Sequence, residues 1–275
     1  MGLRVLGESL KARLTAFVLG VMLVAMGVGI VIPSLVAARA LRTQANDHLA
    51  ARATDLQQAV SSWFNATRDT LRLMASSPEV LSLDGARQQP LLAAARATYP
   101  DTFLIMTTDR QGTNVARSDG GKPNKYGDRK YIKEVLAGAP LASEVVISKT
   151  IQKPVVTLAT GLRDAQGELA GTLTSVTELT RLAQSIGATR LGDTGLAYLV
   201  DSNDKVVAHP ESAIASTLAD FSKDEAVVRM RQQRGGNFTL VLHKDPRSGK
   251  PTRPTEYLVH SALLDNGWGV VVMQQ

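Results

Sequence analysis

A run of 25 residues without a charged side chain, residues 14–38 (LTAFVLGVMLVAMGVGIVIPSLVAA), constrains this chain more than any other feature. An α-helix of that length would be roughly 37 Å long, enough to cross a hydrocarbon core of about 30 Å. The apolar part of a cleavable signal peptide is usually about 7–15 residues, although Ala37 and Ala38 leave cleavage open as an alternative. We therefore expect a transmembrane helix at residues 14–38.

The charges on either side of this segment predict its orientation. Arg4, Lys11 and Arg13 precede it, and Arg39 and Arg42 follow it. Because basic residues collect on the cytoplasmic side, residues 1–13 are expected to form a cytoplasmic tail. The chain would then cross the inner (cytoplasmic) membrane once, and its bulk would be periplasmic or otherwise extracytoplasmic.

The composition excludes several kinds of chemistry. The chain has no Cys, so disulfides, thiolate nucleophiles and Cys-based metal sites are ruled out. No two of its four His stand at metal-ligand spacing, and it contains no G-x-S-x-G, H-E-x-x-H or P-loop motif. We therefore expect no enzyme activity, no metal and no cofactor.

The net charge of +6 is concentrated in one stretch. Residues 117–153 hold eight basic and four acidic residues, which accounts for the whole excess of 28 basic over 24 acidic residues after residue 38. Such a local excess suits a small anion better than the extended footprint of a polyanion, so no nucleic-acid partner is expected.

Beyond the apolar segment, apolar residues recur every three or four positions, which predicts a long amphipathic helix over residues 39–78. Ser76, Ser77 and Pro78 are expected to end it. We interpret this helix as a stalk whose seam either forms a homodimer contact or packs on the domain that follows. The seam residues are Leu49, Ala53, Leu56, Val60, Trp63, Thr67, Leu71 and Met74.

The rest of the chain alternates between strand-like and helical segments. Short connections between the strands predict antiparallel pairing. The expected strands are 102–108, 113–116, 142–150, 154–162, 168–177, 237–243, 256–264 and 268–273, and the expected helices are 128–138, 178–186 and 223–233.

One strand–turn–strand pattern occurs twice. IMTTDRQGTNVAR ends at Arg117 and AYLVDSNDKVVAH ends at His209, with Asp109 and Asp201 at matching positions 92 residues apart. Val115 and Ala116 match Val207 and Ala208 at the same offset, which suggests two copies of one module.

The order of three motifs supports a family resemblance. Tyr126-Gly-Asp-Arg-Lys-Tyr131 is followed by VVISKTIQKPVVT (145–157) and then by Asp193-Thr-Gly, Tyr198-Leu-Val-Asp and His209-Pro. Over residues 14–275 the chain resembles the double Cache (PAS-like) sensor region of bacterial transmembrane receptors, especially methyl-accepting chemotaxis proteins. The resemblance implies an α+β fold with a transmembrane helix, a stalk helix and two tandem modules with antiparallel sheets. These would be a membrane-distal module at 79–189, which holds the ligand pocket, and a membrane-proximal module at 190–275.

The resemblance also implies the site. Arg129 takes the position whose planar guanidinium commonly clamps a ligand carboxylate, and Tyr131 takes the aromatic position of the same motif. The expected ligand-binding set is Arg117, Tyr126, Asp128, Arg129, Tyr131, Ser148 and Lys149.

The ligand class follows from what the chain lacks. Amino-acid-binding members carry a Tyr and acidic residues where this chain has Val145, Ile147 and, approximately, Val176. A buried ammonium group without an anionic partner is costly, so a free amino acid or polyamine is disfavoured. We expect a small organic anion such as a mono- or dicarboxylate.

Simpler interpretations stay open for the same residues. Arg129 could flank a helix and pair with Asp128 or Glu134 on the surface, and Tyr131 could be plain core. Lys149 and Lys153 could be solvated, His209 could be structural, and Trp63 and Trp268 could serve packing.

The expected function is small-molecule sensing by a transmembrane chemoreceptor. The alternatives are the sensor region of a histidine kinase or diguanylate cyclase, or a membrane-anchored adaptor without a small ligand. After Leu264 neither a second membrane span nor a signalling domain follows, so we expect this chain to be a fragment of a longer receptor.

Overall fold

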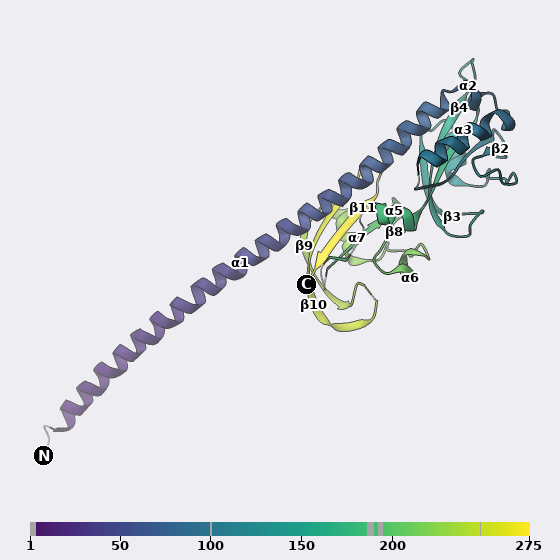
Figure 1. Ribbon diagram of the computed structural model, residues 1–275. Helices are drawn as coiled ribbons and strands as arrows, with labels where there is room; N and C mark the ends of the chain where they lie inside the picture. The colour runs from purple at the N-terminus through teal and green to yellow at the C-terminus, as the bar shows by residue number, and fades with distance from the viewer. Residues whose placement is uncertain (1–3, 100, 186–189, 192–194, 248) are drawn as a thin grey trace. The chain divides into compact units, whose positions relative to one another are not determined.

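A computed structural model describes residues 4–99, 101–185, 190–191, 195–247 and 249–275 (Figure 1). The chain divides into two units, Met1–His48 and Leu49–Gln275, and helix α1 (Arg4–Ala75) contributes residues to both. Residues 1–3 of the expected tail, Ile186 at the end of an expected helix, the expected module boundary at 189 and the pair Asp193-Thr194 lie outside the described residues.

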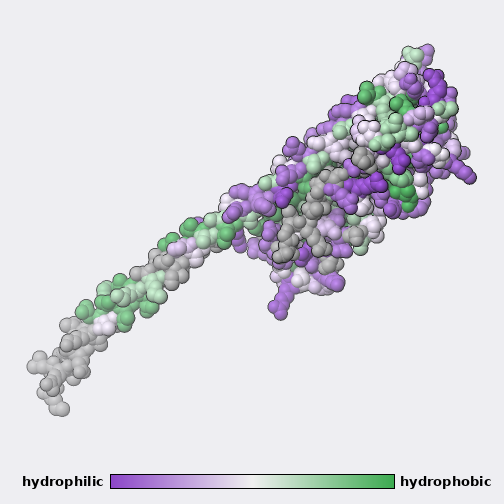
Figure 2. Space-filling model, in the orientation of Figure 1, coloured by the Kyte–Doolittle hydropathy of each residue, from purple (hydrophilic) through white to green (hydrophobic). Residues whose placement is uncertain are grey.

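In the first unit, the expected tail and the 14–38 segment belong to one continuous helix. Its described side chains are largely apolar and exposed, for example Leu14 (67%), Phe17 (69%) and Leu23 (70%), and they form the green stretch in Figure 2. Within the part of the chain that the structure describes, no helix is long and apolar enough to cross a membrane.

In the second unit, α1 ends at Ala75, as the Ser-Ser-Pro sequence predicts. Ser77 then caps the short helix α2 (Pro78–Leu81) by accepting a hydrogen bond from the amide of Val80. The predicted seam packs on the chain's own sheets, which buries six of its eight residues: Leu49, Ala53, Leu56, Val60, Leu71 and Met74. Of the two interpretations of the seam, packing on the following domain is therefore the one observed.

Two antiparallel sheets follow, and they share one topology. The first has the order β2-β1-β5-β4-β3 and the second β8-β7-β11-β10-β9, with β6 as an extra strand beside β7. The predicted antiparallel pairing, α+β class and repeated module are thus confirmed. The first sheet consists of β1 (Thr102–Asp109), β2 (Asn114–Arg117), β3 (Ala142–Ile147), β4 (Pro154–Arg163) and β5 (Leu169–Glu178). The second consists of β6 (Arg190–Leu191), β7 (Gly195–Val200), β8 (Val206–Ala208), β9 (Gly235–Lys244), β10 (Pro251–Leu263) and β11 (Gly269–Gln274).

The repeat extends to individual hydrogen bonds in the first turn of each sheet. Asp109 accepts at Oδ1 from the amides of Gln111 (2.9 Å) and Thr113 (2.8 Å). Asp201 accepts at Oδ1 from the amides of Asn203 (2.8 Å) and Lys205 (2.9 Å). Each Asp therefore closes its turn through the same side-chain-to-backbone pattern, which explains why Asp recurs at this offset.

Helices cover both faces of each sheet. On the first sheet, α1, α2 and α3 (Gly85–Thr98) pack on one face and α4 (Lys130–Leu136) on the other. On the second sheet, α1 packs on one face and α7 (Glu225–Gln233) on the other. The remaining helices are α5 (Leu179–Ser185) and α6 (Ser212–Ala215).

Helix α3 has no counterpart among the predicted elements. Its apolar face is weak because one of its two fully buried residues is polar: Gln88 donates to the carbonyl of Val80 and accepts from the hydroxyl of Thr107. A buried but hydrogen-bonded glutamine breaks the apolar periodicity that would have predicted the helix.

Candidate ligand-binding site

A narrow cleft lies on the α4 face of the first sheet. Its walls come from β1, β4 and β5, from the loop that leads into α4, and from the end of β3 with the loop after it. The room left in it for water-sized molecules is about 20 Å³, so the cleft is closed in this structure. The lining residues are Leu104, Met106, Tyr126, Arg129, Tyr131, Val146, Ile147, Ser148, Lys149, Thr150, Val155, Thr157 and Val176.

Two glycines fix the loop that carries Tyr126 and Arg129. The amide of Tyr126 donates to the carbonyl of Gly112 (2.7 Å), which pins this loop to the β1–β2 turn. Gly112 has a positive φ of 73°, and a Cβ on it would lie 2.5 Å from the Cα of Gly127. A Cβ on Gly127 would lie 2.7 Å from the carbonyl oxygen of Gln111. The Gly of the Tyr-Gly-Asp-Arg motif is therefore required by this close backbone approach.

Arg129 and Tyr131 enter the cleft from the start of α4. Arg129 is the N-cap residue of this helix, and its Nη2 donates to the carbonyl oxygen of Ile147 (3.1 Å). No carboxylate among the described residues forms a salt bridge with Arg129, so the alternative of a surface pair with Asp128 or Glu134 is not observed. Tyr131 is 2% exposed, and this burial raises the pKa of its hydroxyl well above the usual range. Its ring belongs to the hydrophobic core and also lines the cleft.

Lys149 brings a second cation to the cleft. Its Nζ donates to the carbonyl of Lys125 (2.8 Å) and to Oδ1 of Asp128 (2.7 Å), and it lies 5.6 Å from the centre of the Tyr126 ring. The hydrogen bond from Lys149 holds the pKa of the exposed Asp128 carboxyl below its ordinary value. Asp128 itself does not line the cleft, whereas Lys149 does.

Arg117 lies behind Tyr126 and outside the cleft lining. Its guanidinium is held by Asp119 through two hydrogen bonds (2.9 and 2.7 Å), and it also donates to the hydroxyls of Tyr126 (3.2 Å) and Thr150 (3.3 Å). Hydrogen bonding to Asp119 raises the pKa of Arg117 and lowers that of Asp119. This buried group connects two walls of the cleft, a role that its charge alone did not indicate.

Ser148 shapes the loop between β3 and β4. Its Oγ accepts from the amides of Thr150 (3.2 Å) and Ile151 (3.4 Å), and this local turn presents Lys149 and Thr150 to the cleft.

Of the seven predicted site residues, the structure thus places five in the lining and two, Arg117 and Asp128, in contact with it. The sequence reasoning missed the apolar floor, Leu104, Met106 and Val155, because β1 and β4 are buried on both faces and show no alternation. Ile147 and Val176 line the cleft as expected, but Val145 belongs to the core on the opposite face, and its neighbour Val146 lines the cleft. Strand alternation explains why Val145 and Val146 lie on opposite faces, whereas Ile147 is the last residue of β3.

Comparisons with known proteins agree with this architecture. A relative, the methyl-accepting chemotaxis protein PscA of Pseudomonas syringae pv. tomato, is 26% identical over 215 residues, which cover 76% of this chain. The chain spans about a third (33%) of the length of that relative.

Solved structures show the same fold at low sequence identity. The ligand-binding domain of the Pseudomonas fluorescens chemoreceptor CtaA, in complex with L-serine, aligns with a TM-score of 0.65 at 14% identity over 85% of this chain and 98% of that one. The corresponding domain of Campylobacter jejuni Tlp3, in complex with L-valine, gives 0.62 at 12% identity over 86% and 95%. An extracellular domain assigned to a histidine kinase, rpHK1S-Z16, gives 0.69 at 15% identity over 87% and 96%.

The family model described as Cache domain matches residues 37–275, which include both sheets and the cleft. This chain belongs to the Cache domain family.

Proposed function

We propose that this chain is the sensing region of a membrane chemoreceptor, and that it binds a small organic anion in the cleft of the first sheet. The observation that carries the proposal is the lining of the cleft: it has two cations, Arg129 and Lys149, two tyrosines, and no acidic side chain among the described residues. Such a lining complements a carboxylate, which Arg can bind through two parallel hydrogen bonds.

The absence of a lining carboxylate favours an organic anion over an amino acid. The solved neighbours CtaA and Tlp3 were crystallised with L-serine and L-valine, which carry an ammonium group as well as a carboxylate. In this chain the carbonyl oxygens nearest the two cations, those of Ile147 and Lys125, already accept from Arg129 and Lys149. An ammonium group would have to compete with these two cations for the carbonyl oxygens, and no carboxylate among the described residues lines the cleft to pair with it.

Ligand binding requires the cleft to open. With about 20 Å³ of internal space, the closed form has no room for even a small dicarboxylate. The contacts that a ligand would replace are the hydrogen bond from Arg129 to Ile147 and the ion pair of Lys149 with Asp128 (2.7 Å). We propose that the ligand binds Arg129 and Lys149 and thereby stabilises an open form of the cleft. This opening would shift the position of α1 on the other face of the sheet.

The membrane context belongs to the same proposal. The charge-free sequence 14–38 and the exposed apolar side chains of that stretch support an anchor in the inner membrane, with the sheets on the extracytoplasmic side. A homodimer through α1 would not use the buried seam. It would use the exposed face of the helix, on which Leu73 is 75% exposed.

The output of the receptor is proposed to be chemotaxis signalling, because the relative PscA is a methyl-accepting chemotaxis protein. The likeness to an extracellular histidine kinase domain supports a sensor kinase as the second candidate.

A thermal-shift screen of residues 39–275 with carboxylates, amino acids, purines and amines tests the proposed ligand class. A ligand at 100 times its Kd adds about 2.7 kcal/mol to the stability of the folded state. For a domain of this size we expect a rise in Tm of roughly 5–10 °C.

Variants then locate the ligand. Arg129→Ala should abolish the Tm rise, whereas Lys130→Ala removes a neighbouring charge whose Nζ faces Glu134 (3.7 Å) outside the cleft and should preserve it. A shift with amines alone would refute the anionic ligand, and no shift with any compound would favour the adaptor interpretation.

A further inference from the structure

Two hydroxyl groups in the wall of the cleft, those of Tyr126 and Thr150, are both bound from behind by Arg117. Arg117 Nη1 donates to the Tyr126 hydroxyl (3.2 Å), and Nη2 donates to the Thr150 hydroxyl (3.3 Å). A guanidinium group has only donors, so each hydroxyl oxygen is the acceptor in its contact with Arg117. The direction of these two hydrogen bonds is therefore fixed, and each hydroxyl keeps its own proton for another acceptor.

At least one of these two protons has no acceptor among the described residues. The two hydroxyl oxygens are 3.5 Å apart, so one hydroxyl can donate to the other, but only one proton can lie between them. Neither hydroxyl has a further partner in the described part of the chain. Tyr126 is 4% exposed, and both residues line the cleft. Because a largely buried donor without an acceptor is costly, an acceptor that entered the cleft here would gain a hydrogen bond.

Asp119 holds Arg117 in the position that this arrangement requires. Its carboxylate oxygens accept from Nε (2.9 Å) and Nη2 (2.7 Å) of Arg117, whose side chain is 3% exposed. The carboxylate compensates the charge of Arg117, so this arginine serves to orient the two hydroxyls rather than to bind an anion itself. A lysine could not replace it, because a single ammonium group lacks the planar fork that contacts Asp119 and two hydroxyls at once.

The hydrogen-bond donors of the cleft thus fall into two groups. One is Arg129, whose Nη2 lies 3.1 Å from the carbonyl oxygen of Ile147. The other consists of the two hydroxyls and of Lys149, which precedes Thr150 in the chain and has its Nζ 5.6 Å from the centre of the Tyr126 ring. A monocarboxylate bound by Arg129 through two parallel hydrogen bonds uses both of its oxygens there and leaves the second group of donors without an acceptor.

We propose that the ligand is a dicarboxylate and that its second acid group accepts hydrogen bonds from the hydroxyls of Tyr126 and Thr150. Since the first acid group is the one that the proposed function assigns to Arg129, the dicarboxylate rests on that proposed function. Tyr126 and Thr150 then determine the specificity for a second acid group. Arg117 is a positioning residue, which acts through these hydroxyls without touching the ligand.

Isothermal titration calorimetry on the full 275-residue chain in detergent micelles tests the second acid group. The probes are malonate, succinate and glutarate, each paired with the monocarboxylate of equal carbon number: propionate, butyrate and valerate. At about pH 8 all carboxyl groups of these acids are ionised, and the ionic strength is matched with sodium chloride. We expect at least one dicarboxylate to bind about tenfold more tightly than its partner, because it gains hydrogen bonds to a charged group.

Tyr126→Phe removes one hydroxyl and keeps the ring. It should weaken binding of the preferred dicarboxylate about ten- to hundredfold and change that of the paired monocarboxylate by less than about twofold. Arg117→Lys should also weaken only the dicarboxylate. It should have little further effect once Tyr126→Phe and Thr150→Val are in place, since Arg117 acts through these hydroxyls. A merely structural role would weaken both acids of the pair together, and thermal unfolding of each variant checks that it is folded.

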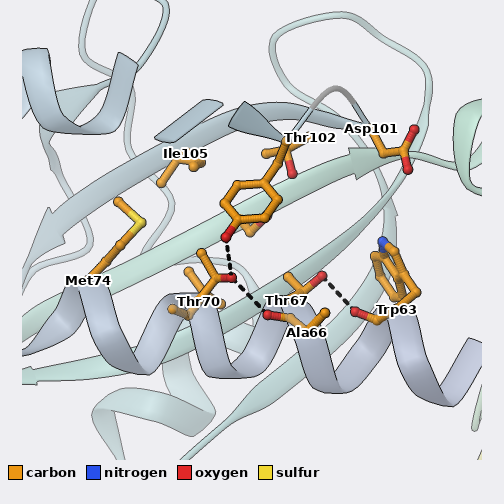
Figure 3. A pocket seen from close by; sticks show the side chains of 11 residues that line it. Trp63, Ala66, Thr67, Thr70, Met74, Asp101, Thr102 and Ile105 are labelled. Carbon is orange, nitrogen blue, oxygen red and sulfur yellow. Dashed lines mark hydrogen bonds between the residues drawn. The ribbon is translucent and has the colours of Figure 1, made fainter. Parts of the chain in front are cut away.

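The other face of the first sheet supplies the matched control. A separate cavity there is lined by residues that include Thr70, Met74 and Ile105 (Figure 3). The hydroxyl of Tyr99 forms a hydrogen bond with Thr70 Oγ1 (3.1 Å). Tyr99→Phe therefore removes a tyrosine hydroxyl outside the cleft, and it should leave the affinity for both acids unchanged.

The possible outcomes separate this inference from the proposed function. If both acids of every pair bind equally, or if Tyr126→Phe weakens both to the same extent, the second acid group is refuted and the anion-binding cleft stands. If no carboxylate binds to the folded chain, the proposed function fails and the dicarboxylate fails with it.

Discussion

At the mouth of the cleft, the carboxylate of Asp128 forms an ion pair with Lys149, which is one of the two cations that a ligand would need. Asp128 is 2.7 Å from Lys149 Nζ, and its side chain is 63% exposed. An exposed ion pair of this kind contributes about 0.2–1 kcal/mol. That energy opposes the binding of any anion that recruits Lys149, so Asp128 acts as an internal competitor.

We therefore predict that Asp128→Asn raises the affinity for an anionic ligand by about two- to fivefold. Isothermal titration calorimetry with the carboxylate found by thermal shift would measure the change. Glu134→Gln, which removes an acid paired with Lys130 (3.7 Å) outside the cleft, is the matched control. Unchanged or weaker binding in Asp128→Asn would show that Asp128 does not compete with the ligand.

His209 provides a second prediction at this scale. It is 7% exposed, its Nδ1 accepts from the amide of Glu211 (3.0 Å), and its Nε2 is buried without a hydrogen-bond partner among the described residues. Burial lowers the pKa of His209, and burial also lowers that of His260. Below about pH 6.5 the unfolded chain thus binds more protons than the folded one, so stability falls as the pH falls toward the lowered pKa.

Urea unfolding at pH 7.5 and 5.5 would measure this dependence. We expect a lower free energy of unfolding at pH 5.5, and a smaller difference between the two pH values in His209→Gln and in His260→Gln. His243→Gln changes an exposed residue of β9 and should behave like the parent chain. Equal pH dependence in all four proteins would exclude His209 and His260 as its cause.

What the sequence revealed about single residues depended on their motif. Arg129 and Tyr131 belong to the Tyr-Gly-Asp-Arg-Lys-Tyr motif that carries the family resemblance, and both line the cleft. Arg117 looked equally suitable by charge, but Asp119, two residues further on, holds its guanidinium. A sequence shows which residues carry charge, whereas the partner of each charge depends on how the turns fold.

At the scale of elements, the close contact between two loops sets the geometry of the cleft. Gly127 has no space for a side chain because the carbonyl oxygen of Gln111 lies 2.7 Å from where its Cβ would be. We predict that Gly127→Ala displaces the loop that carries Tyr126 and Arg129. The variant should lose roughly 1–3 kcal/mol of stability and bind the anion at least tenfold more weakly.

The control is Gly120→Ala in the same connection. Gly120 has open space around it, but its φ of 64° adds backbone strain, so this variant should lose stability without losing affinity in proportion. Chemical denaturation and calorimetry on both proteins separate the two effects. Equal affinity in Gly127→Ala and the parent would show that the cleft does not depend on this contact.

Most elements could be predicted because their local signals agree with the fold. The strands have β-branched runs bounded by Asp and Gly turns, and the Asp of the β1–β2 turn recurs in the β7–β8 turn with the same hydrogen bonds. Helix α3 could not be predicted, since the burial of Gln88 depends on partners in α2 and β1 that are distant in sequence. Similarly, the 13-residue β10 begins at Pro251, before its predicted start at residue 256, because its pairing with β9 continues outside the apolar run.

At the scale of the whole second unit, α1 belongs to the cores of both sheets. Leu71 packs beside Ile105 of the first sheet, and Trp63, two turns earlier, stacks on Trp268 of the second. One hydrophobic cluster includes residues of α1 and of both sheets. A helix shared in this way should make the two sheets unfold together, and it gives a change at the first sheet a direct path to the second.

Leu71→Ala tests this coupling, because Leu71 is 1% exposed and faces the first sheet. We predict a loss of about 2–5 kcal/mol, the usual cost of a cavity at a buried leucine. In hydrogen exchange, protection should fall in β7 to β11 as well as in β1 to β5, since both rest on the same helix. Leu73→Ala, on the 75% exposed side of α1, should change stability by less than about 0.5 kcal/mol. A loss of protection confined to β1–β5 would mean that each sheet unfolds alone, and signal transfer would then need a route other than the core of α1.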